Sequence, residues 1–235
     1  MPKLAQIAYS NSTCEDLWDV FQKQTLKHSK LDLCITADKE LKDLGLSFSK
    51  IYSNDDPYWE VWVDAVNSFP YDYFIYMQED FFLYEDINHD KIDEYLKYLD
   101  EHPEYSFVRL LKSGNLGNRK IHETLYEIES SNPNIFSMQA SIWRSSDYIK
   151  LMETVRDAKW LENENYRKAM ISLGMKGLYH YDNEELRGQN HYDSNVYPYI
   201  ATALVRGQWN INEYPKELTP ILLENNIDIN KRGQI

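Results

Sequence analysis

The stretch YFIYMQEDFFLYEDI, residues 73–87, runs from an apolar and aromatic segment into two carboxylates, Glu79 and Asp80, and then returns at once to apolar residues. Acidic side chains are usually exposed, so one interpretation is a solvated turn between two buried segments. The other is a divalent-cation site at the edge of a sheet, because carboxylate oxygens are natural ligands of Mg²⁺ and Mn²⁺. The flanking sequence decides between them.

Three more apolar segments of strand length precede this stretch, at residues 4–9, 31–36 and 46–52. Residues 13–27 have apolar side chains at helical spacing, and a second helix is expected after Asp56-Pro57, with Asp56 as its N-cap. Alternating strands and helices indicate an α/β fold with a mixed, mostly parallel central sheet flanked by helices. The N-terminal half is therefore expected to be Rossmann-like.

Mostly polar residues follow each of the four expected strands. They are Tyr9-Ser10-Asn11, Thr36-Ala37-Asp38, Asn54-Asp55-Asp56 and Gln78-Glu79-Asp80. Parallel sheets bind ligands at the carboxyl ends of their strands, where successive loops converge. The last of these turns is followed directly by aromatic residues, so we expect it to be short and covered. This favours a binding site over a solvated turn.

The second half of the chain is less regular. Its expected strands and helices cover residues 90–101, 105–111, 134–143, 148–155, 160–174 and 176–181, with a loop at 113–120. No linker rich in Pro, Gly or Ser and no repeat interrupts the sequence, so a single domain is expected over 1–235. Within it we distinguish a first half at about 1–87, a second half at about 88–215, and a C-terminal tail at 216–235.

Composition bounds the function. The chain has 235 residues, and its formal net charge of −13, from 38 acidic and 25 basic residues, argues against a nucleic-acid-binding surface. The sequence shows neither a run of about 18 apolar residues nor the basic and apolar regions of a signal peptide. Its two cysteines form no CxxC pair, which fits a reducing compartment. A cytoplasmic protein without a transmembrane segment is expected.

Several common motifs are absent, among them GxGxxG, GxxxxGK[ST], GxSxG and HExxH. Asp86, Asn88 and Asp90 imitate the first ligands of an EF-hand loop. The imitation breaks at Lys91, where that loop needs Gly, and at Lys97, where it needs Glu. Calcium binding of that type is not expected.

The order of these parts resembles a GT-A-fold glycosyltransferase over about residues 4–210. The resemblance rests on AYSNSTCEDLW (8–18), TADKE (36–40), the run at 51–87, FSMQASIWRSSDYIKLM (136–152) and WLENE (160–164). In such enzymes a strand ending in a DxD-type motif holds the metal ion and the diphosphate of a sugar nucleotide. Here the triplet is Gln78-Glu79-Asp80, so an amide replaces the first acid. The resemblance implies a DxD-like motif in which Asp80 binds Mn²⁺ or Mg²⁺.

The same resemblance implies the residues around a nucleotide-diphosphate sugar, the donor substrate. They are Tyr9, Ser10, Asn11, Asp38, Asp55, Gln78 and Glu79. The carboxylates would contact the base or ribose, and Gln78 or Glu79 would contact ribose or a bound water. A late histidine is often a further metal ligand in this fold. His191 and His180 both qualify, and we favour His191 because it lies in a polar, loop-like segment.

Sugar transfer also needs a base that takes the proton of the acceptor hydroxyl, and a partly desolvated carboxylate is suited to this. Glu162 and Glu164 are the candidates. Because they are two residues apart near a helix start, at most one of them is expected to point into the cleft. The resemblance favours Glu164, with direct displacement and inversion. The alternative is that both acids only complement the helix N-terminus.

The sequence thus predicts an enzyme, a metal-assisted, inverting glycosyltransferase that moves a sugar from a nucleotide-diphosphate sugar to a hydroxyl acceptor such as a glycan. A nucleotidyltransferase would share the sheet and the acidic pair, but the first turn offers neither its Gly-rich phosphate loop nor its basic residue. A non-catalytic carbohydrate-binding module would explain the 14% aromatic residues without needing Asp80 or Glu164. These alternatives stay open at the level of sequence.

Overall fold

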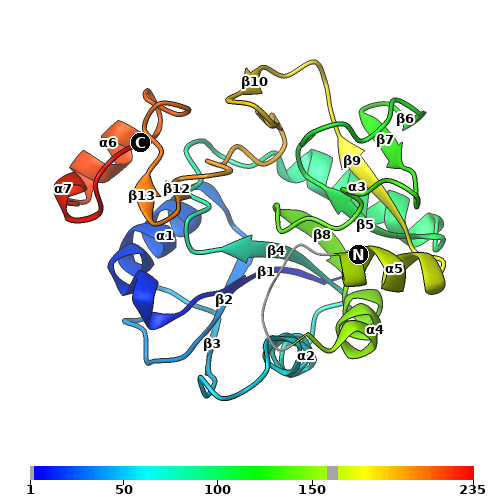
Figure 1. Ribbon diagram of the computed structural model, residues 1–235, viewed down its shortest axis with the longest axis horizontal. Helices are drawn as coiled ribbons and strands as arrows, with labels where there is room; N and C mark the ends of the chain where they lie inside the picture. Colours follow the sequence, from blue (N-terminus) through cyan, green and yellow to red (C-terminus); the bar gives the residue numbers. More distant parts are fainter. Residues whose placement is uncertain (1–2, 158–163) are drawn as a thin grey trace.

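One large sheet runs through the computed structural model, which describes residues 3–157 and 164–235 (Figure 1). In these residues nine strands form the sheet, in the order β3-β2-β1-β4-β8-β5-β9-β7-β6. The strands are β1 (Leu4–Tyr9), β2 (Asp32–Ala37), β3 (Phe48–Ile51), β4 (Tyr73–Gln78), β5 (Tyr105–Arg109), β6 (Lys120–His122), β7 (Leu125–Ile128), β8 (Ser141–Arg144) and β9 (Lys176–His180).

The strand directions confirm the predicted mixed, mostly parallel α/β sheet. β3, β2, β1 and β4 are neighbours and run parallel, and β5 and β9 form a further parallel pair. Following the pairings along the sheet, β8 and β7 are the described strands that run against the others. The N-terminal half has the predicted strand-helix-strand order, because α1 (Glu15–His28) connects β1 to β2.

Helices cover both faces of the sheet (Figure 1). They are α1, α2 (Tyr58–Ser68), α3 (His89–Glu101), α4 (Ser145–Val155), α5 (Glu164–Ser172), α6 (Leu218–Glu224) and α7 (Ile229–Arg232), with a 3-10 turn η1 (Ser12–Cys14). Side chains that alternate along β1 enter opposite cores. Ile7 packs in the core under α2, α4 and α5, whereas Ala8 packs in the core under α1 and α3. Burial on both faces explains why β1 reads as a continuous apolar run.

Several expected boundaries are wrong. Residues 134–140 do not form a strand, and β8 begins at Ser141. The expected loop at 113–120 is followed by a hairpin of β6 and β7 that the sequence analysis misses. Pro57, not Asp56, is the N-cap of α2, because the Asp56 carboxylate accepts from the Ser53 amide (2.9 Å).

The C-terminal segment 216–235, expected as a tail, contains α6 and α7. Two short antiparallel pairs precede it, formed by β10 (Leu186–Arg187) with β11 (His191–Tyr192) and by β12 (Leu204–Val205) with β13 (Gln208–Trp209). The Trp209 amide donates to the Gly233 carbonyl (3.0 Å), and the Ile235 amide donates to the Trp209 carbonyl (3.1 Å). These bonds fix the end of the chain beside β13, and the ion pair between Arg232 and Asp16 connects α7 to α1. No described helix is both long enough and apolar enough to span a bilayer.

Gly177 in β9 provides a test of this packing. A Cβ atom added there would lie 2.0 Å from Cζ of Phe107, whose ring stacks on Trp143 with centroids 4.4 Å apart. We expect Gly177→Ala to lower the free energy of unfolding by about 1–3 kcal/mol through overpacking, measured by urea denaturation. Adding Phe107→Leu should recover part of the loss. An unchanged urea midpoint in Gly177→Ala would contradict this packing.

Candidate functional site

The carboxyl ends of β1, β2, β3 and β4 lie at one edge of the sheet because these four neighbours are parallel. Hydrogen bonds continue just past the strand ends. The Ser10 amide donates to the Thr36 carbonyl (3.0 Å), and the Tyr52 amide donates to the Ala37 carbonyl (3.0 Å). The turns that carry the predicted site residues are thereby held next to one another.

Aromatic rings cover the end of β1. Tyr9 and Tyr52 are stacked, with centroids 5.3 Å apart and an interplanar angle of 17°, and Tyr58 packs edge-on against Tyr9 at 5.2 Å. Burial and the hydrogen bond with Tyr9 raise the pKa of Tyr52, and the negative charges of Asp38 and Glu79 raise it further. The tyrosine pair, Asp38 and Glu79 therefore belong to one cluster. Both stacked rings are half-buried and can offer a partly exposed edge or face to a planar base.

Ser10, Asn11 and Asp38 shape the turn after β1. The Trp18 indole donates to Ser10 Oγ (2.6 Å), which fixes the buried serine. Asn11 Oδ1 accepts from the Thr13 amide (3.1 Å) and caps η1. Asp38 accepts from both the Ser12 amide (2.7 Å) and the Ser12 hydroxyl (2.8 Å). A carboxylate has about four acceptor positions, so Asp38 retains capacity for a ligand hydroxyl.

Glu79 and Asp80 are both half-buried directly after β4. Burial raises the pKa of Glu79, and hydrogen bonds with Cys14 and Ser10 oppose that rise. Burial, and then the negative charge of Glu79, raise the pKa of Asp80 to about 7, although a backbone hydrogen bond from Leu204 stabilises the charged form. The ionised pair is thus held at a cost in free energy. A bound cation would remove that cost.

Arg232 approaches this pair from α7. Its guanidinium forms an ion pair with Asp16, in which Nε lies 2.8 Å from Oδ2, and Nη2 donates to the Thr13 carbonyl (3.3 Å). Its positive charge also partly opposes the rise in the pKa values of Glu79 and Asp80. The C-terminal helix therefore adds a cationic group at the first turn.

The two other predicted nucleotide-binding residues are Gln78 and Asp55. Gln78 ends β4, and its amide donates to Tyr76 Oη (3.1 Å), which in turn lies 3.6 Å from Met138 Sδ. Asp55 is exposed, and its backbone amide donates to Ser53 Oγ (3.3 Å). Its role in nucleotide binding stays a prediction.

A cavity of about 330 Å³ lies farther along the same edge, at the end of β5 and just before β8. We call it the Arg109 cavity; its lining includes Arg109, Ser113, Phe136, Ser137, Gln139 and His191. The Tyr76–Met138 contact connects the segment before β8 to the end of β4. The cavity and the acidic pair therefore lie along the same edge of the sheet. Another cavity, of about 650 Å³ and lined by Tyr73, Asp100 and Arg144, lies at the amino end of β4, away from this edge.

His191, the predicted metal ligand, lines the Arg109 cavity, and Asp80 is not among the residues that line it. His191 Nε2 lies 3.2 Å from Nε2 of Gln139. His180, the other histidine considered, is buried, with Nδ1 at 2.7 Å from Tyr95 Oη and Nε2 bound to Glu184. His180 is therefore part of a core network. Metal binding by His191 stays a prediction.

Glu164 is the first residue of α5, and it is exposed. Its Oε2 accepts from Arg167 Nε (2.8 Å), and this ion pair lowers the pKa of Glu164. An exposed carboxylate with a lowered pKa is a weak base, so the geometry argues against the role that the resemblance favours. Glu162 lies outside the described residues.

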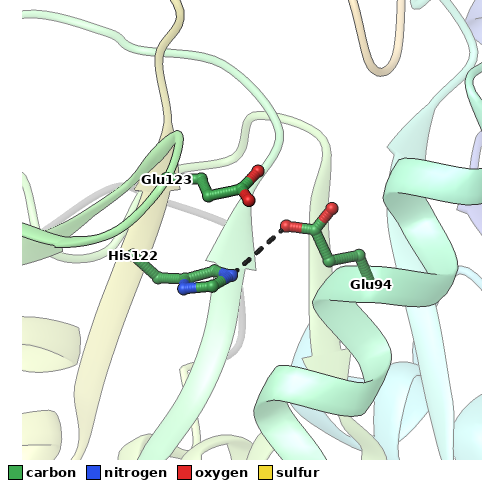
Figure 2. A group of neighbouring side chains, drawn as sticks. All are labelled: Glu94, His122 and Glu123. Atoms are coloured by element: carbon green, nitrogen blue, oxygen red, sulfur yellow. Dashed lines mark ion pairs between the residues drawn. The ribbon is translucent and has the colours of Figure 1, made fainter.

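Within 3–157 and 164–235, one group of three side chains has metal-ligand atoms within 4.8 Å of one another: Glu94, His122 and Glu123 (Figure 2). Figure 2 shows the Glu94 carboxylate on α3 facing the His122 ring and Glu123 at the end of β6. His122 Nε2 lies 3.4 Å from Glu94, and Lys91 Nζ donates to Glu94 (2.7 Å) and Glu123 (2.8 Å). Because the Lys91 ammonium already partly neutralises these carboxylates, the group is a salt-bridge cluster that ties α3 to β6.

The sequence analysis missed Tyr52, Arg232 and the Arg109 cavity. Tyr52 carries a local signal, because it is the last residue of the expected strand at 46–52 and directly follows β3, at the same edge as the acidic pair. Arg232 has only a weak sequence signal. Asp228 and Gly233 cap the short helix α7, but no local pattern shows that this helix packs beside Asp16. Arg109 reads as an ordinary residue at the end of a strand.

No family model matches the chain, and no curated protein matches it. Solved structures do resemble it. CMP:2-keto-3-deoxy-manno-octonic acid synthetase complexed with CTP has 10% sequence identity and a TM-score of 0.48, with 75% of this chain and 88% of that one covered. The mannosyltransferase PcManGT from Pyrobaculum calidifontis, in complex with GDP-Man and Mn²⁺, has 10% identity and a TM-score of 0.47, over 77% of this chain and 55% of that one.

A cytidylyltransferase from Leptospira borgpetersenii is similar over 96% of both chains, with 14% identity and a TM-score of 0.47. These similar structures thus include one named a mannosyltransferase, one named a cytidylyltransferase and one named a synthetase. All three have sequence identities of 10–14% to this chain and TM-scores of 0.47–0.48.

Proposed function

We propose that this chain binds a nucleoside diphosphate sugar with a divalent cation and transfers the sugar to a hydroxyl acceptor. The observation that carries the proposal is the half-buried pair Glu79 and Asp80, placed directly after β4 where β1, β2 and β3 also end. Asp38 and the stacked tyrosines Tyr9 and Tyr52 lie in the same cluster. These groups lie at the carboxyl ends of parallel strands, where such sheets bind ligands: the carboxylates can hold a cation, and the aromatic rings can pack against a base.

The donor set fits Mn²⁺ or Mg²⁺. Two adjacent carboxylates with raised pKa values carry charge that their surroundings do not fully compensate, and hard divalent cations prefer such oxygen ligands. Asp80 would bind the cation, with Glu79 next to it. When bound there, the cation supplies positive charge that stabilises the departing diphosphate.

The nucleotide would lie along the ends of β1 and β2. A base can pack against the Tyr9 and Tyr52 rings, and Asp38 can accept from a ribose hydroxyl. Ser10 and Asn11 shape the turn beneath it rather than offering open side chains, because their polar atoms already bind Trp18 and Thr13.

The acceptor would enter from the Arg109 cavity, at the end of β5, which is two strands from β4 in the sheet. Its hydroxyl oxygen forms the new bond to the anomeric carbon, the bond from that carbon to the diphosphate breaks, and a base takes the hydroxyl proton. Tyr166 of α5 stacks on Phe136 of this cavity, with centroids 4.2 Å apart. The segment WLENE, which leads into α5, is therefore the proposed source of the base.

The test is thermal unfolding with UDP, GDP, dTDP or CDP, each with and without Mn²⁺. A ligand at about 100 times its Kd stabilises the folded state by about 2.7 kcal/mol. For a chain of this size, that corresponds to a rise in Tm of roughly 5–10 °C. We expect one nucleotide to give this rise, only with Mn²⁺, and Asp80→Asn to abolish it. The matched control, Asp93→Asn, changes an exposed acid on α3 and should respond as the wild type does.

Nucleotidyl transfer is a second candidate because of one observation. Lys231 and Arg232 line a cavity of about 460 Å³ with Ser12 and Thr13, and so supply the cationic side chains that the first turn lacks. In that case a nucleoside triphosphate should stabilise the protein more than the diphosphate does. Pyrophosphate should be released when a sugar phosphate is supplied as the acceptor. If no nucleotide changes Tm with or without Mn²⁺, the carbohydrate-binding alternative replaces both.

A further inference from the structure

Arg232 is bound to the turn after β1, which carries three of the predicted nucleotide-binding residues. Its Nε and Nη2 donate to the Asp16 carboxylate, and Nη2 also donates to the Thr13 carbonyl (3.3 Å). A guanidinium has five N–H donors, and these bonds use only those of Nε and Nη2. The two donors of Nη1 therefore remain for a ligand. The side chain is 15% exposed, so a ligand can reach it.

Cys14 connects Arg232 with the acidic pair. The Cys14 thiol contacts both the Glu79 carboxylate and the Arg232 guanidinium. The positive charge of Arg232 also acts on Asp80. The guanidinium is thus close to the two carboxylates that are proposed to hold a cation. A diphosphate bound to that cation brings further negative oxygens to the same place, and charge-assisted hydrogen bonds from a guanidinium to such oxygens are strong.

A cavity of about 460 Å³ gives access to Arg232. We call it the α7 cavity; its lining includes Ser12, Thr13, Glu15, Asp16, Lys231 and Arg232. Both acids in this lining have cationic partners, because Asp16 pairs with Arg232 and Glu15 accepts from Lys39 Nζ (2.8 and 2.9 Å). Lys231 is exposed and adds a further positive charge. The α7 cavity can therefore admit an anion.

The α7 cavity adjoins the cluster proposed to bind the nucleotide. Ser12 lines it, and the Ser12 amide (2.7 Å) and hydroxyl (2.8 Å) both donate to Asp38, the proposed partner of a ribose hydroxyl. Figure 1 shows α7 at the end of the chain beside α1, which begins at the same turn. A segment distant in sequence thus meets the turn after β1.

Arg232 is not the sole anchor of α7. The Trp209 amide donates to the Gly233 carbonyl (3.0 Å), the Ile235 amide donates to the Trp209 carbonyl (3.1 Å), and Asn212 Nδ2 donates to the Ile235 carbonyl (2.7 Å). These bonds keep the helix in place when the ion pair with Asp16 is lost. A role of Arg232 in binding can therefore be measured separately from its role as an anchor.

We propose that Arg232 donates through Nη1 to the diphosphate of the bound nucleotide, so that the C-terminal helix α7 is part of the donor site. This inference rests on the proposed function, which supplies the nucleotide. When the bond from the anomeric carbon to the diphosphate breaks, its electron pair stays on the diphosphate oxygen. Arg232 then stabilises the added negative charge of the leaving group.

The test is calorimetric titration of the full chain with UDP, GDP, dTDP, CDP and inorganic pyrophosphate, each with Mn²⁺. Pyrophosphate carries the diphosphate without a base or ribose. We expect Arg232→Gln to weaken pyrophosphate and the nucleotide that binds by the same factor, about 10–100-fold, because it removes hydrogen bonds to a charged group. Arg232→Lys should recover part of the loss. If pyrophosphate fails to bind the wild type, or binds Arg232→Gln equally well, the proposal is wrong.

Asp16→Asn distinguishes phosphate binding from anchoring. It breaks the same ion pair as Arg232→Gln, but it leaves the guanidinium in place and gives Nε an amide oxygen as acceptor. We expect Asp16→Asn to bind the diphosphate at least as tightly as the wild type, because a competing negative charge is gone. Lys97→Gln, which removes an exposed positive charge from α3, is the control and should bind as the wild type does. Equal weakening in Asp16→Asn and Arg232→Gln would show that Arg232 only anchors α7.

The failure of this inference can be told apart from the failure of the proposed function. If a nucleotide binds only with Mn²⁺ and only when Asp80 is present, yet binds Arg232→Gln normally, the proposed function stands and this inference is overturned. If no nucleotide binds the wild type but pyrophosphate binds and depends on Arg232, the phosphate site stands and the proposed function fails.

Discussion

Replacing Asp80 by asparagine is expected to stabilise the ligand-free protein at pH 8 and, in the same variant, to lower sugar transfer by about 100-fold or more. The two effects have one cause. The protein holds a carboxylate where burial and Glu79 disfavour its charge, and the proposed reaction needs that charge to hold the cation. A structural acid would not show both.

The direction of the pH dependence follows from the pKa of Asp80, about 7 in the folded protein against 3.8 in the unfolded chain. Between these values the folded state holds a proton that the unfolded state has lost, so the wild type loses stability as pH rises from about 4 to 7. Above pH 7 the loss is complete. One pKa unit corresponds to about 1.4 kcal/mol, which, discounted for partial exposure, gives on the order of 2–4 kcal/mol.

The measurement is the free energy of unfolding by urea in EDTA, at pH 5 and at pH 8, for the wild type, Asp80→Asn and the exposed control Asp93→Asn. The gain of Asp80→Asn over the wild type should be small at pH 5 and largest at pH 8. Saturating Mn²⁺ should remove most of the difference by stabilising the wild type alone. A gain that is equal at both pH values would contradict the raised pKa.

Three of the strands that end at this site, β1, β2 and β4, could be predicted from sequence because each is a short, mostly apolar run between polar turns, buried on both faces. The pair Glu79 and Asp80 stood out for the same reason, since two acids interrupt such a run. The segment 134–143 was predicted as a strand on the same criterion. That prediction is wrong over 134–140. Arg109 donates to the carbonyl oxygens of Asn134 and Ile135, which in a strand would accept from the amides of a neighbouring strand.

The parts that could not be predicted depend on contacts between distant residues. Arg232 pairs with Asp16 across 216 positions of the chain, and no local pattern specifies such a contact. The Arg109 cavity likewise depends on β5, β8 and β11 meeting, although each residue in it is ordinary in sequence. Whether Glu162 or Glu164 is the base stays a prediction, because Glu162 lies outside the described residues.

Glutamine substitutions at these two positions are expected to give opposite results. Glu164 is exposed and forms an ion pair with Arg167, which lowers its pKa and its strength as a base. Such an exposed pair contributes little to stability, so Glu164→Gln should leave stability and kcat nearly unchanged. Glu162 is then the remaining candidate of the two, and Glu162→Gln should lower kcat by roughly 10²–10⁴-fold.

The comparison is informative because both variants replace the same residue type within one short segment. Nucleotide binding, measured by the Mn²⁺-dependent rise in Tm, should be the same in both variants and the wild type, because the base acts on the acceptor hydroxyl and not on the diphosphate. In Glu162→Gln, kcat should therefore fall while the Tm response stays. If Glu164→Gln alone loses activity, the Arg167 ion pair must open during the reaction, and the base is Glu164. If both retain activity, WLENE carries no base, and the proton leaves by another group at the Arg109 cavity, where His191 Nε2 lies 3.2 Å from Nε2 of Gln139.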